Sequence, residues 1–176
     1  MDEVHFQQHG SRCRMWVPPE EDDPVCRHAP TRKSISYFGA VRIRDGKLLM
    51  SAPKGNFDAR TCWQFLRRLQ RLACRSGRKV VVITDNARYH HARLHKDWRK
   101  QVSNHFQLYF LPPYSPELNP VERVWKLTRR RCLHNQYFPG LSDVVSAVTP
   151  TFQSWSRPNS TLSRLCSIAY SIGNYL

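Results

Sequence analysis

The chain has 176 residues and a mass of 20.7 kDa, a length that suits one domain with a substantial core. Hydrophobic residues make up 40% and charged residues 23%, as in a globular protein rather than a disordered one. No apolar run approaches the 18 residues of a membrane span, and we expect no secretory signal in the polar first residues. The net charge of +15 favours a polyanionic partner, above all nucleic acid, although membrane-surface proteins share such a charge.

The first part of the chain predicts three strands joined by antiparallel connections. Alternation of apolar and polar residues predicts strands over residues 2–8 and 34–43, separated by a loop rich in proline and acidic residues. Asp45-Gly46 is a strong hairpin signal, so residues 47–52 form the returning strand.

A helix and a buried strand follow. Asp58 can cap a helix that Gly77 would end, and a continuous β-branched run over residues 80–83 predicts a central strand covered on both faces. The apolar residues at helical spacing are Trp63, Leu66, Leu69 and Leu72-Ala73.

The second half alternates helices with a strand. We expect a weakly patterned helix over residues 92–102, a strand over 106–111 and a helix from Pro120. The tail from Leu141 has helical patterning that is interrupted by Pro150 and Pro158. This order predicts an α/β fold with a mixed five-stranded sheet, three antiparallel strands followed by parallel strands, flanked by helices.

Three acidic residues stand out in this basic chain. Asp2 lies in the first strand, Asp85 at the carboxyl end of the central strand, where open α/β sheets place their sites, and Glu122 in the first turn of a helix. Converging carboxylates repel one another, and hard divalent cations such as Mg²⁺ or Mn²⁺ relieve that repulsion. Two such ions can activate a water or a 3′-hydroxyl at a phosphodiester.

Each acid also has an ordinary structural interpretation. Asp2 could be a solvated terminal residue, and Asp85-Asn86 a plain turn. Glu122 has the strongest alternative, because Asn119-Pro120-Val121-Glu122 has the form of a helix start with a capping box. The prediction of a metal site therefore depends on the three acids together.

Two sequence blocks carry a specific family resemblance. Residues 81–91 read VVITDNARYHH and residues 110–125 read FLPPYSPELNPVERVW, and Glu122 follows Asp85 after 36 intervening residues. Together they closely resemble the DDE transposases of the mariner superfamily, in its bacterial insertion-sequence branch. The resemblance covers roughly residues 2–135.

The resemblance implies a ribonuclease H-like fold and a metal-binding triad that maps to Asp2, Asp85 and Glu122. It implies two Mg²⁺ or Mn²⁺ ions, nicking of DNA at the ends of an element, and transfer of the freed 3′-hydroxyl into target DNA. The implied assembly is a homodimer on paired ends, without a membrane partner, in the bacterial cytosol and associated with the nucleoid.

Other residues receive supporting roles. Asn86 orients Asp85 or a metal-bound water, with a turn cap as the alternative, and His90 contacts the scissile phosphate or is a structural histidine at a helix start. Asn119 begins the helix that carries Glu122. Phosphate contacts, or alternatively only a solvated basic face, are assigned to Arg67, Arg68, Arg71, Arg129, Arg130 and Arg131.

The cysteines are spread along the chain without a CxxC pair, and we expect them to be reduced. A zinc site from Cys13, Cys26 and His28 is the alternative, although no second ligand pair at finger spacing follows.

We expect a catalytic domain over residues 1–135 and a helical extension of the same domain over 136–176, with the family's N-terminal helix-turn-helix region absent. Two functions compete with the transposase. One is a truncated, catalytically weak or inactive fragment that binds DNA non-specifically, and the other is a structure-selective nuclease on the same fold.

Overall fold

The computed structural model describes residues 1–20, 25, 27–75 and 77–167. The order of strands and helices is the one that the sequence predicts. The strands are β1 (Asp2–Gln7), β2 (Ser34–Arg42), β3 (Lys47–Ser51), β4 (Val80–Thr84) and β5 (Phe106–Phe110). The α-helices are α1 (Ala59–Cys74), α2 (Lys96–Gln101), α3 (Pro120–Cys132), α4 (Leu141–Trp155) and α5 (Ser160–Cys166), and short 3-10 turns cover Arg88–His91, Arg93–His95 and Pro116–Leu118.

The first three strands form an antiparallel sheet in the order β1-β2-β3, as predicted. Its register places Asp2 opposite Gly39. The predicted hairpin between β2 and β3 is confirmed: Gly46 has φ of +71° and its N–H donates to the carbonyl of Arg42 at 2.8 Å. A positive φ of this kind favours glycine.

The remaining strands, β4 and β5, pair in parallel as a separate sheet. The prediction of three antiparallel and two parallel strands is thus confirmed, but a single five-stranded sheet is wrong. The strands β1 and β4 meet only at their ends, where the amino group of Met1 donates to the carbonyl of Ile83 at 2.7 Å. This contact places Asp2 beside the strand end that leads to Asp85.

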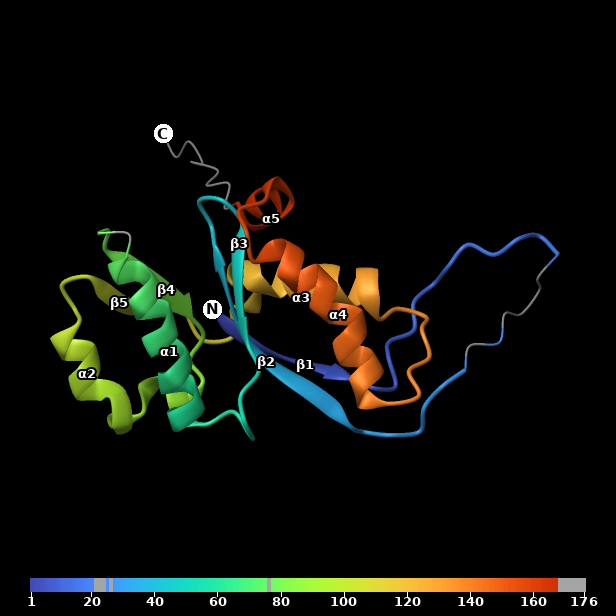
Figure 1. Ribbon diagram of the computed structural model, residues 1–176, viewed down its shortest axis with the longest axis horizontal. Helices are drawn as coiled ribbons and strands as arrows, with labels where there is room; N and C mark the ends of the chain where they lie inside the picture. Colours follow the sequence, from blue (N-terminus) through green and yellow to red (C-terminus); the bar gives the residue numbers. More distant parts are fainter. Residues whose placement is uncertain (21–24, 26, 76, 168–176) are drawn as a thin grey trace.

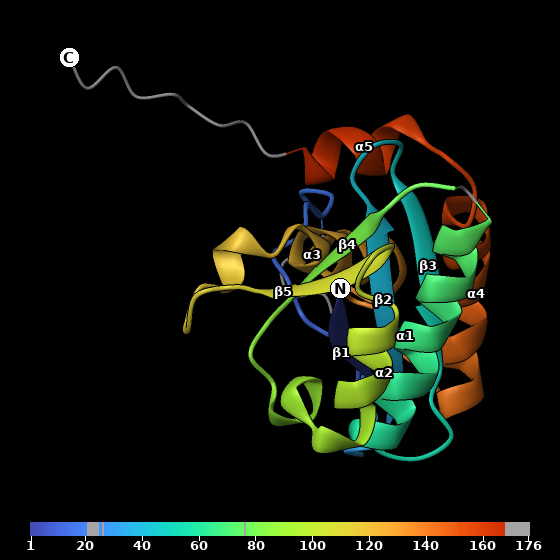
Figure 2. The same ribbon diagram turned by 90° about the vertical axis from the view of Figure 1, so that its left-hand side faces the viewer.

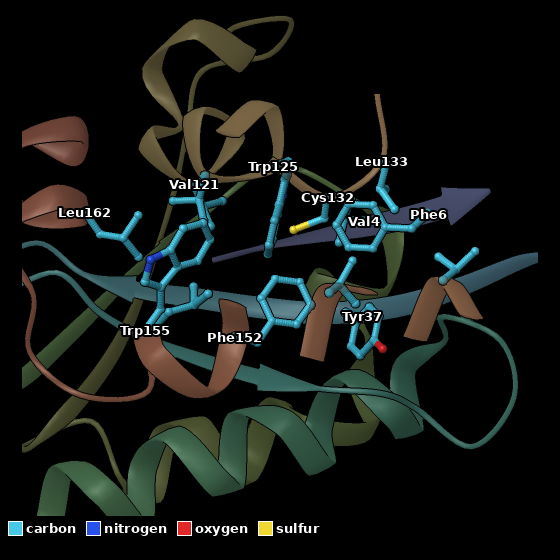
Figure 3. Packing of buried hydrophobic residues seen from close by; sticks show 14 of the residues in the cluster. Val4, Phe6, Tyr37, Val121, Trp125, Cys132, Leu133, Phe152, Trp155 and Leu162 are labelled. Atoms are coloured by element: carbon cyan, nitrogen blue, oxygen red, sulfur yellow. The ribbon is translucent and has the colours of Figure 1, made fainter. Parts of the chain in front are cut away.

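The β1-β2-β3 sheet carries a hydrophobic cluster on each face. Figures 1 and 2 show α3, α4 and α5 on one side of it and α1 with β4 and β5 on the other. The larger cluster joins β1 and β2 to α3, α4 and α5 through residues that include Val4, Phe6, Trp125, Phe152 and Leu162 (Figure 3). The smaller one includes Met1, Phe38, Cys62, Phe65, Leu66, Val82 and Phe106.

The prediction that β4 is covered on both faces is wrong. Val82 and Thr84 are buried, whereas Val81 is 50% and Ile83 36% exposed. The smaller cluster covers only the face that carries Val82, and nothing in the described chain buries the other face to the same degree. A run of β-branched residues does not by itself distinguish a strand with one covered face from a strand with two.

The helix α1 has the predicted ends and only part of the predicted buried face. The N–H of Thr61 donates to Asp58 Oδ1 at 2.7 Å, which confirms the cap, and Gly77 after the helix has φ of +62°. The buried residues are Cys62, Phe65 and Leu66, with Leu69 packed beside them. These residues have the i, i+3, i+4, i+7 spacing of one helix face. Of the predicted residues, Leu66 and Leu69 lie on this face, whereas Trp63 is only partly buried and Leu72 is 40% exposed.

The tail packs against the main core through α4 and α5, with Pro158 between them as predicted. The expected interruption at Pro150 is wrong, because Pro150 lies exposed inside α4, whose buried residues Val144, Val148 and Phe152 hold both sides of it in place. The weak pattern over 92–102 gives a 3-10 turn and the short α2. Residues 168–176 of the predicted extension lie outside the described residues. No described helix is long and apolar enough to cross a membrane.

Candidate active site

A pocket of about 280 Å³ brings the three predicted acids together. It lies where the ends of β1 and β4 meet the start of α3. Its acids therefore come from the first sheet and from the elements on either side of that sheet. The loop between β5 and α3 forms the rest of its wall. The residues that line it are Asp2, Asp85, Asn86, Ala87, Leu111, Pro112, Pro113, Tyr114, Ser115, Pro116, Asn119 and Glu122.

Asp2 is held firmly by its surroundings and is only 6% exposed, so the interpretation as a solvated terminal acid is wrong. The indole N–H of Trp125 donates to Asp2 Oδ2 at 2.9 Å. Burial raises the pKa of Asp2 to about 7, the Trp125 hydrogen bond opposes this, and the charges of Glu122 and Glu3 add to the rise. The carboxyl group therefore lies within electrostatic reach of Glu122.

Asp85 follows β4 and is held through one of its two oxygens. Oδ1 lies 2.9 Å from Nδ1 of His90 and accepts the N–H of Ala87 at 3.2 Å. The hydrogen bond from His90 lowers the pKa of Asp85 against the opposing effect of burial. Asp85 is therefore an ionised carboxylate with a fixed orientation. The neighbouring Asn86 donates to the carbonyl of Leu111, which ties the two pocket loops together.

Glu122 lies in the first turn of α3, and the capping box that would explain it is not formed. The side chain of Asn119 accepts no hydrogen bond from the helix, and its amide faces the carbonyl of Met1 at 3.5 Å. Within the described part of the chain, the Glu122 carboxylate has neither a hydrogen-bond nor an ion-pair partner. It lines the pocket and is available to a ligand there.

His90 is fully buried and does not line the pocket, so the structure does not support the phosphate contact. Its Nε2 lies 3.1 Å from Glu3 Oε1, on the side opposite Asp85. Burial would lower the pKa of His90, but hydrogen bonds with Asp85, Cys62 and Glu3 outweigh it and raise the pKa to about 11. The structural interpretation of His90 fits, with two carboxylate partners that sequence reasoning did not assign to it.

The pocket fits a divalent cation in its donor chemistry. Its acids present hard carboxylate oxygens, which Mg²⁺ and Mn²⁺ prefer, and the charge of Glu122 adds to the rise that burial causes in the pKa of Asp2. The described acids and histidines whose donor atoms lie within 4.8 Å of one another are instead Glu3, Asp85 and His90. In that group both histidine nitrogens already face carboxylates.

Three residues near the site went unassigned in the sequence: Glu3, Trp125 and Tyr114. Glu3 follows Asp2 directly, and the pair of adjacent acids at the start of a strand is the sequence signal by which Glu3 could have been found. Tyr114 lies in the proline-rich loop with φ of +57° and a fully exposed side chain on the pocket wall. Sequence spacing does not reveal the contact of Trp125 with Asp2, because 123 positions separate them.

The six predicted phosphate-binding arginines lie outside the residues that line the pocket. Arg67, Arg68 and Arg71 are exposed on α1, where Arg68 donates to the carbonyl of Met50. On α3, Arg129 lies over the ring of Phe6 and Arg131 over that of Trp155, each 5.7 Å from the ring centroid. Arg130 between them is exposed.

The zinc alternative falls partly on Cys26, which lies outside the described residues. Within the described chain, Cys13 and His28 belong to no group of three potential metal ligands. The five described cysteines, at positions 13, 62, 74, 132 and 166, are free thiols.

Comparison with known proteins identifies the family. The family model for DDE superfamily endonucleases matches residues 1–145. An uncharacterized protein of Sinorhizobium fredii is 40% identical over 70 residues, which are 40% of this chain and 48% of that protein. The insertion element IS630 39 kDa protein of Shigella sonnei is 28% identical over 90 residues, 51% of this chain and 26% of the relative. The chain thus spans less than half the length of either relative.

Solved structures of the Mos1 mariner transposase share the fold. The Mos1 strand transfer complex matches with a TM-score of 0.69 at 20% identity, over 94% of this chain and 49% of that chain. The catalytic domain of the same transposase matches with a TM-score of 0.57 at 16% identity, over 94% of this chain and 74% of that domain's chain. The family model covers most of this chain, so the chain belongs to the DDE superfamily endonucleases.

Proposed function

We propose that the chain is the catalytic domain of a transposase, which cleaves DNA strands with a divalent metal and transfers the freed 3′-hydroxyl. The observation that carries this proposal is the pocket in which Asp2, Asp85 and Glu122 meet. Membership of the endonuclease family supports the cleavage step. The Mos1 paired-end complexes with Mn and with Mg support the choice of metal.

Asp2, Asp85 and Glu122 would hold two Mg²⁺ or Mn²⁺ ions, which activate a water or a 3′-hydroxyl and stabilise the leaving oxygen. The chain's own residues prepare that site before any metal enters. Trp125 donates to one oxygen of Asp2, and His90 contacts one oxygen of Asp85, whose second oxygen has no hydrogen bond within the described chain. Glu122 adds a carboxylate without a partner there.

The proposed partners are DNA at the element ends and at the target, bound by a dimer on paired ends. The net charge of +15 and the exposed arginines of α1 and α3 support DNA binding. The Mos1 paired-end complex with the left transposon end is the precedent for the assembly. Sedimentation with end DNA should give two copies per complex, and a single copy would contradict the dimer. A location in the bacterial cytosol, associated with the nucleoid, stays a prediction, which fractionation of expressing cells would test.

The first experiment is nicking of supercoiled plasmid in Mn²⁺ by the full chain, with Asp85→Asn and Glu122→Gln as variants. Each variant removes one charge and keeps the shape, so we expect nicking to fall by at least about a hundredfold, on the scale of a lost catalytic group. A chelator should abolish it. Glu117→Gln, an exposed acid outside the pocket, is the matched control.

Two outcomes would replace the proposal. If the folded wild-type chain binds DNA but does not nick it, the chain is an inactive fragment. If it nicks but does not join a 3′-hydroxyl oligonucleotide to the plasmid, it is a nuclease on the same fold and not a transposase.

A further inference from the structure

A line of polar side chains leads from the wall of the pocket through a fully buried histidine to a second carboxylate. Asp85 lines the pocket, whereas His90 and Glu3 do not. The side chain of His90 is 0% and that of Glu3 11% exposed, compared with 47% for Asp85. His90 is therefore the most buried of the three, and it lies between two carboxylates that are both more exposed than it is.

The contacts along this line are short and directed. His90 Nδ1 lies 2.9 Å from Asp85 Oδ1, and His90 Nε2 lies 3.1 Å from Glu3 Oε1. Ionised carboxylate oxygens only accept hydrogen bonds, so both nitrogens of the imidazole donate. The hydroxyl of Tyr89 also interacts with the carboxylate of Glu3.

The hydrogen bonds to Asp85 are distributed unevenly over its two oxygens. Oδ1 takes both, from His90 and from the N–H of Ala87, and Oδ2 takes none within the described chain. A carboxylate held in this way cannot rotate without breaking two hydrogen bonds. Its second oxygen is therefore available to a cation.

The charges along the line explain why Glu3 is needed. A histidine that donates from both nitrogens is positively charged, and beside Asp85 alone it would make a neutral pair. Glu3 restores one net negative charge to the group. Groups that are hydrogen-bonded to a metal-ligating carboxylate affect how well a site binds its metal.

We propose that Glu3 and His90 are positioning residues that hold Asp85 for the metal and keep its surroundings anionic. This inference rests on the proposed function, because it takes Asp85 as a metal ligand. It assigns to Glu3 no contact with substrate or metal. The same residues would otherwise form a site in which the metal is bound by Glu3 directly, and the test separates these cases.

The experiment measures Mn²⁺ affinity of the full chain by the electron paramagnetic resonance of free Mn²⁺, with no DNA present. Glu3→Gln keeps the shape and removes the charge, and we expect it to weaken Mn²⁺ binding by about tenfold or more. Glu117→Gln removes the same charge from an exposed position outside the pocket, and its effect should stay within about twofold because solvent screens it.

The double variant Glu3→Gln/Asp85→Asn tests how Glu3 acts. If Glu3 acts through Asp85, Glu3→Gln weakens binding much less once Asp85 is an asparagine. An equal loss in both backgrounds would make Glu3 a ligand in its own right and overturn the proposal. Unchanged Mn²⁺ affinity with a lowered melting temperature would make Glu3 a purely structural residue and overturn it as well.

Failure of the proposed function gives a different result. If neither Asp85→Asn nor Glu122→Gln changes Mn²⁺ affinity, the pocket is not a metal site and both proposals fall. If these two weaken binding and Glu3→Gln does not, only the positioning proposal falls. Should Glu3→Gln not fold, Tyr89→Phe loosens Glu3 without changing the charge, and a smaller loss of affinity is expected. No loss would then overturn the proposal.

Discussion

Gly39 of β2 lies against the ring of Trp125, the residue whose indole N–H donates to Asp2. It pairs with Asp2 across the sheet, and the indole of Trp125 packs against it. A β-carbon at this position would overlap the ring of Trp125 and press on the sulfur of Met50. The absence of a side chain at Gly39 therefore lets the indole N–H reach Asp2.

Gly39→Ala should lower the free energy of unfolding by about 1–3 kcal/mol, the usual cost of overpacking a core. Urea denaturation followed by circular dichroism would measure it. In a Trp125→Phe background the smaller ring leaves room, so the same substitution should cost less there. An equal cost in both backgrounds would show that the indole is not what restricts position 39.

At this scale, sequence reasoning found the acids and missed the contacts that span the chain. Asp85 and Glu122 lie in local motifs whose residue types and spacing are specific, and His90, which holds Asp85, follows it by only five positions. The contacts of His90 Nε2 with Glu3 and of Trp125 with Asp2 join residues that are 87 and 123 positions apart. Such pairs depend on how the elements pack, which local patterns do not encode.

Among the elements, α5 is fastened to the tip of the β2-β3 hairpin. Asn159 caps α5 by accepting the N–H of Leu162 at 2.8 Å, and its amide donates to the carbonyl of Gly46 at 3.0 Å. Its backbone N–H also donates to the carbonyl of Asp45 at 2.8 Å. One side chain therefore starts the helix and attaches it to the hairpin.

Asn159→Ala removes the cap and the side-chain amide that donates to the carbonyls of Gly46 and Arg157, and it should cost about 1–3 kcal/mol of unfolding free energy. Asn159→Asp keeps an oxygen for the cap and loses only the amide donor, so its cost should be smaller. Thermal denaturation of the wild type and the two variants would give the order of their stabilities. If Asn159→Asp destabilises as much as Asn159→Ala, the cap contributes nothing to stability.

The ends of helices and strands were more predictable than which of their faces are buried. Turn and cap signals such as Asp45-Gly46 and Asp58 act locally, and the structure contains the expected turn and cap hydrogen bonds. Whether a face of β4 is covered, or whether Pro150 ends a helix, depends on neighbours far away in the chain. The buried side chains on both sides of Pro150 outweigh the hydrogen bond that proline cannot make.

The whole molecule carries a charge of +15, so its binding to non-specific duplex DNA should weaken steeply with salt. Replacing Arg67 and Arg71 of α1 by Gln should reduce the slope of log affinity against log salt by about two, close to one per lost phosphate contact. Fluorescence anisotropy over a salt series measures this slope.

Arg42 provides the matched control for this measurement. Its guanidinium makes hydrogen bonds of 2.7 and 2.6 Å to both carboxylate oxygens of Asp45, so its charge is already neutralised locally. Arg42→Gln should therefore leave the slope nearly unchanged. If the α1 variant behaves like this control, α1 does not face DNA.

The seating of α5 in the larger hydrophobic cluster also bears on how this core is completed during synthesis. Val4 of β1 and Leu162 of α5 belong to the same cluster, although they are far apart in the chain. A ribosome delivers β1 before α5, and contacts this far apart in sequence form slowly. We therefore expect the larger cluster, on which β1 and α3 both pack, to be complete only after α5 has been synthesised.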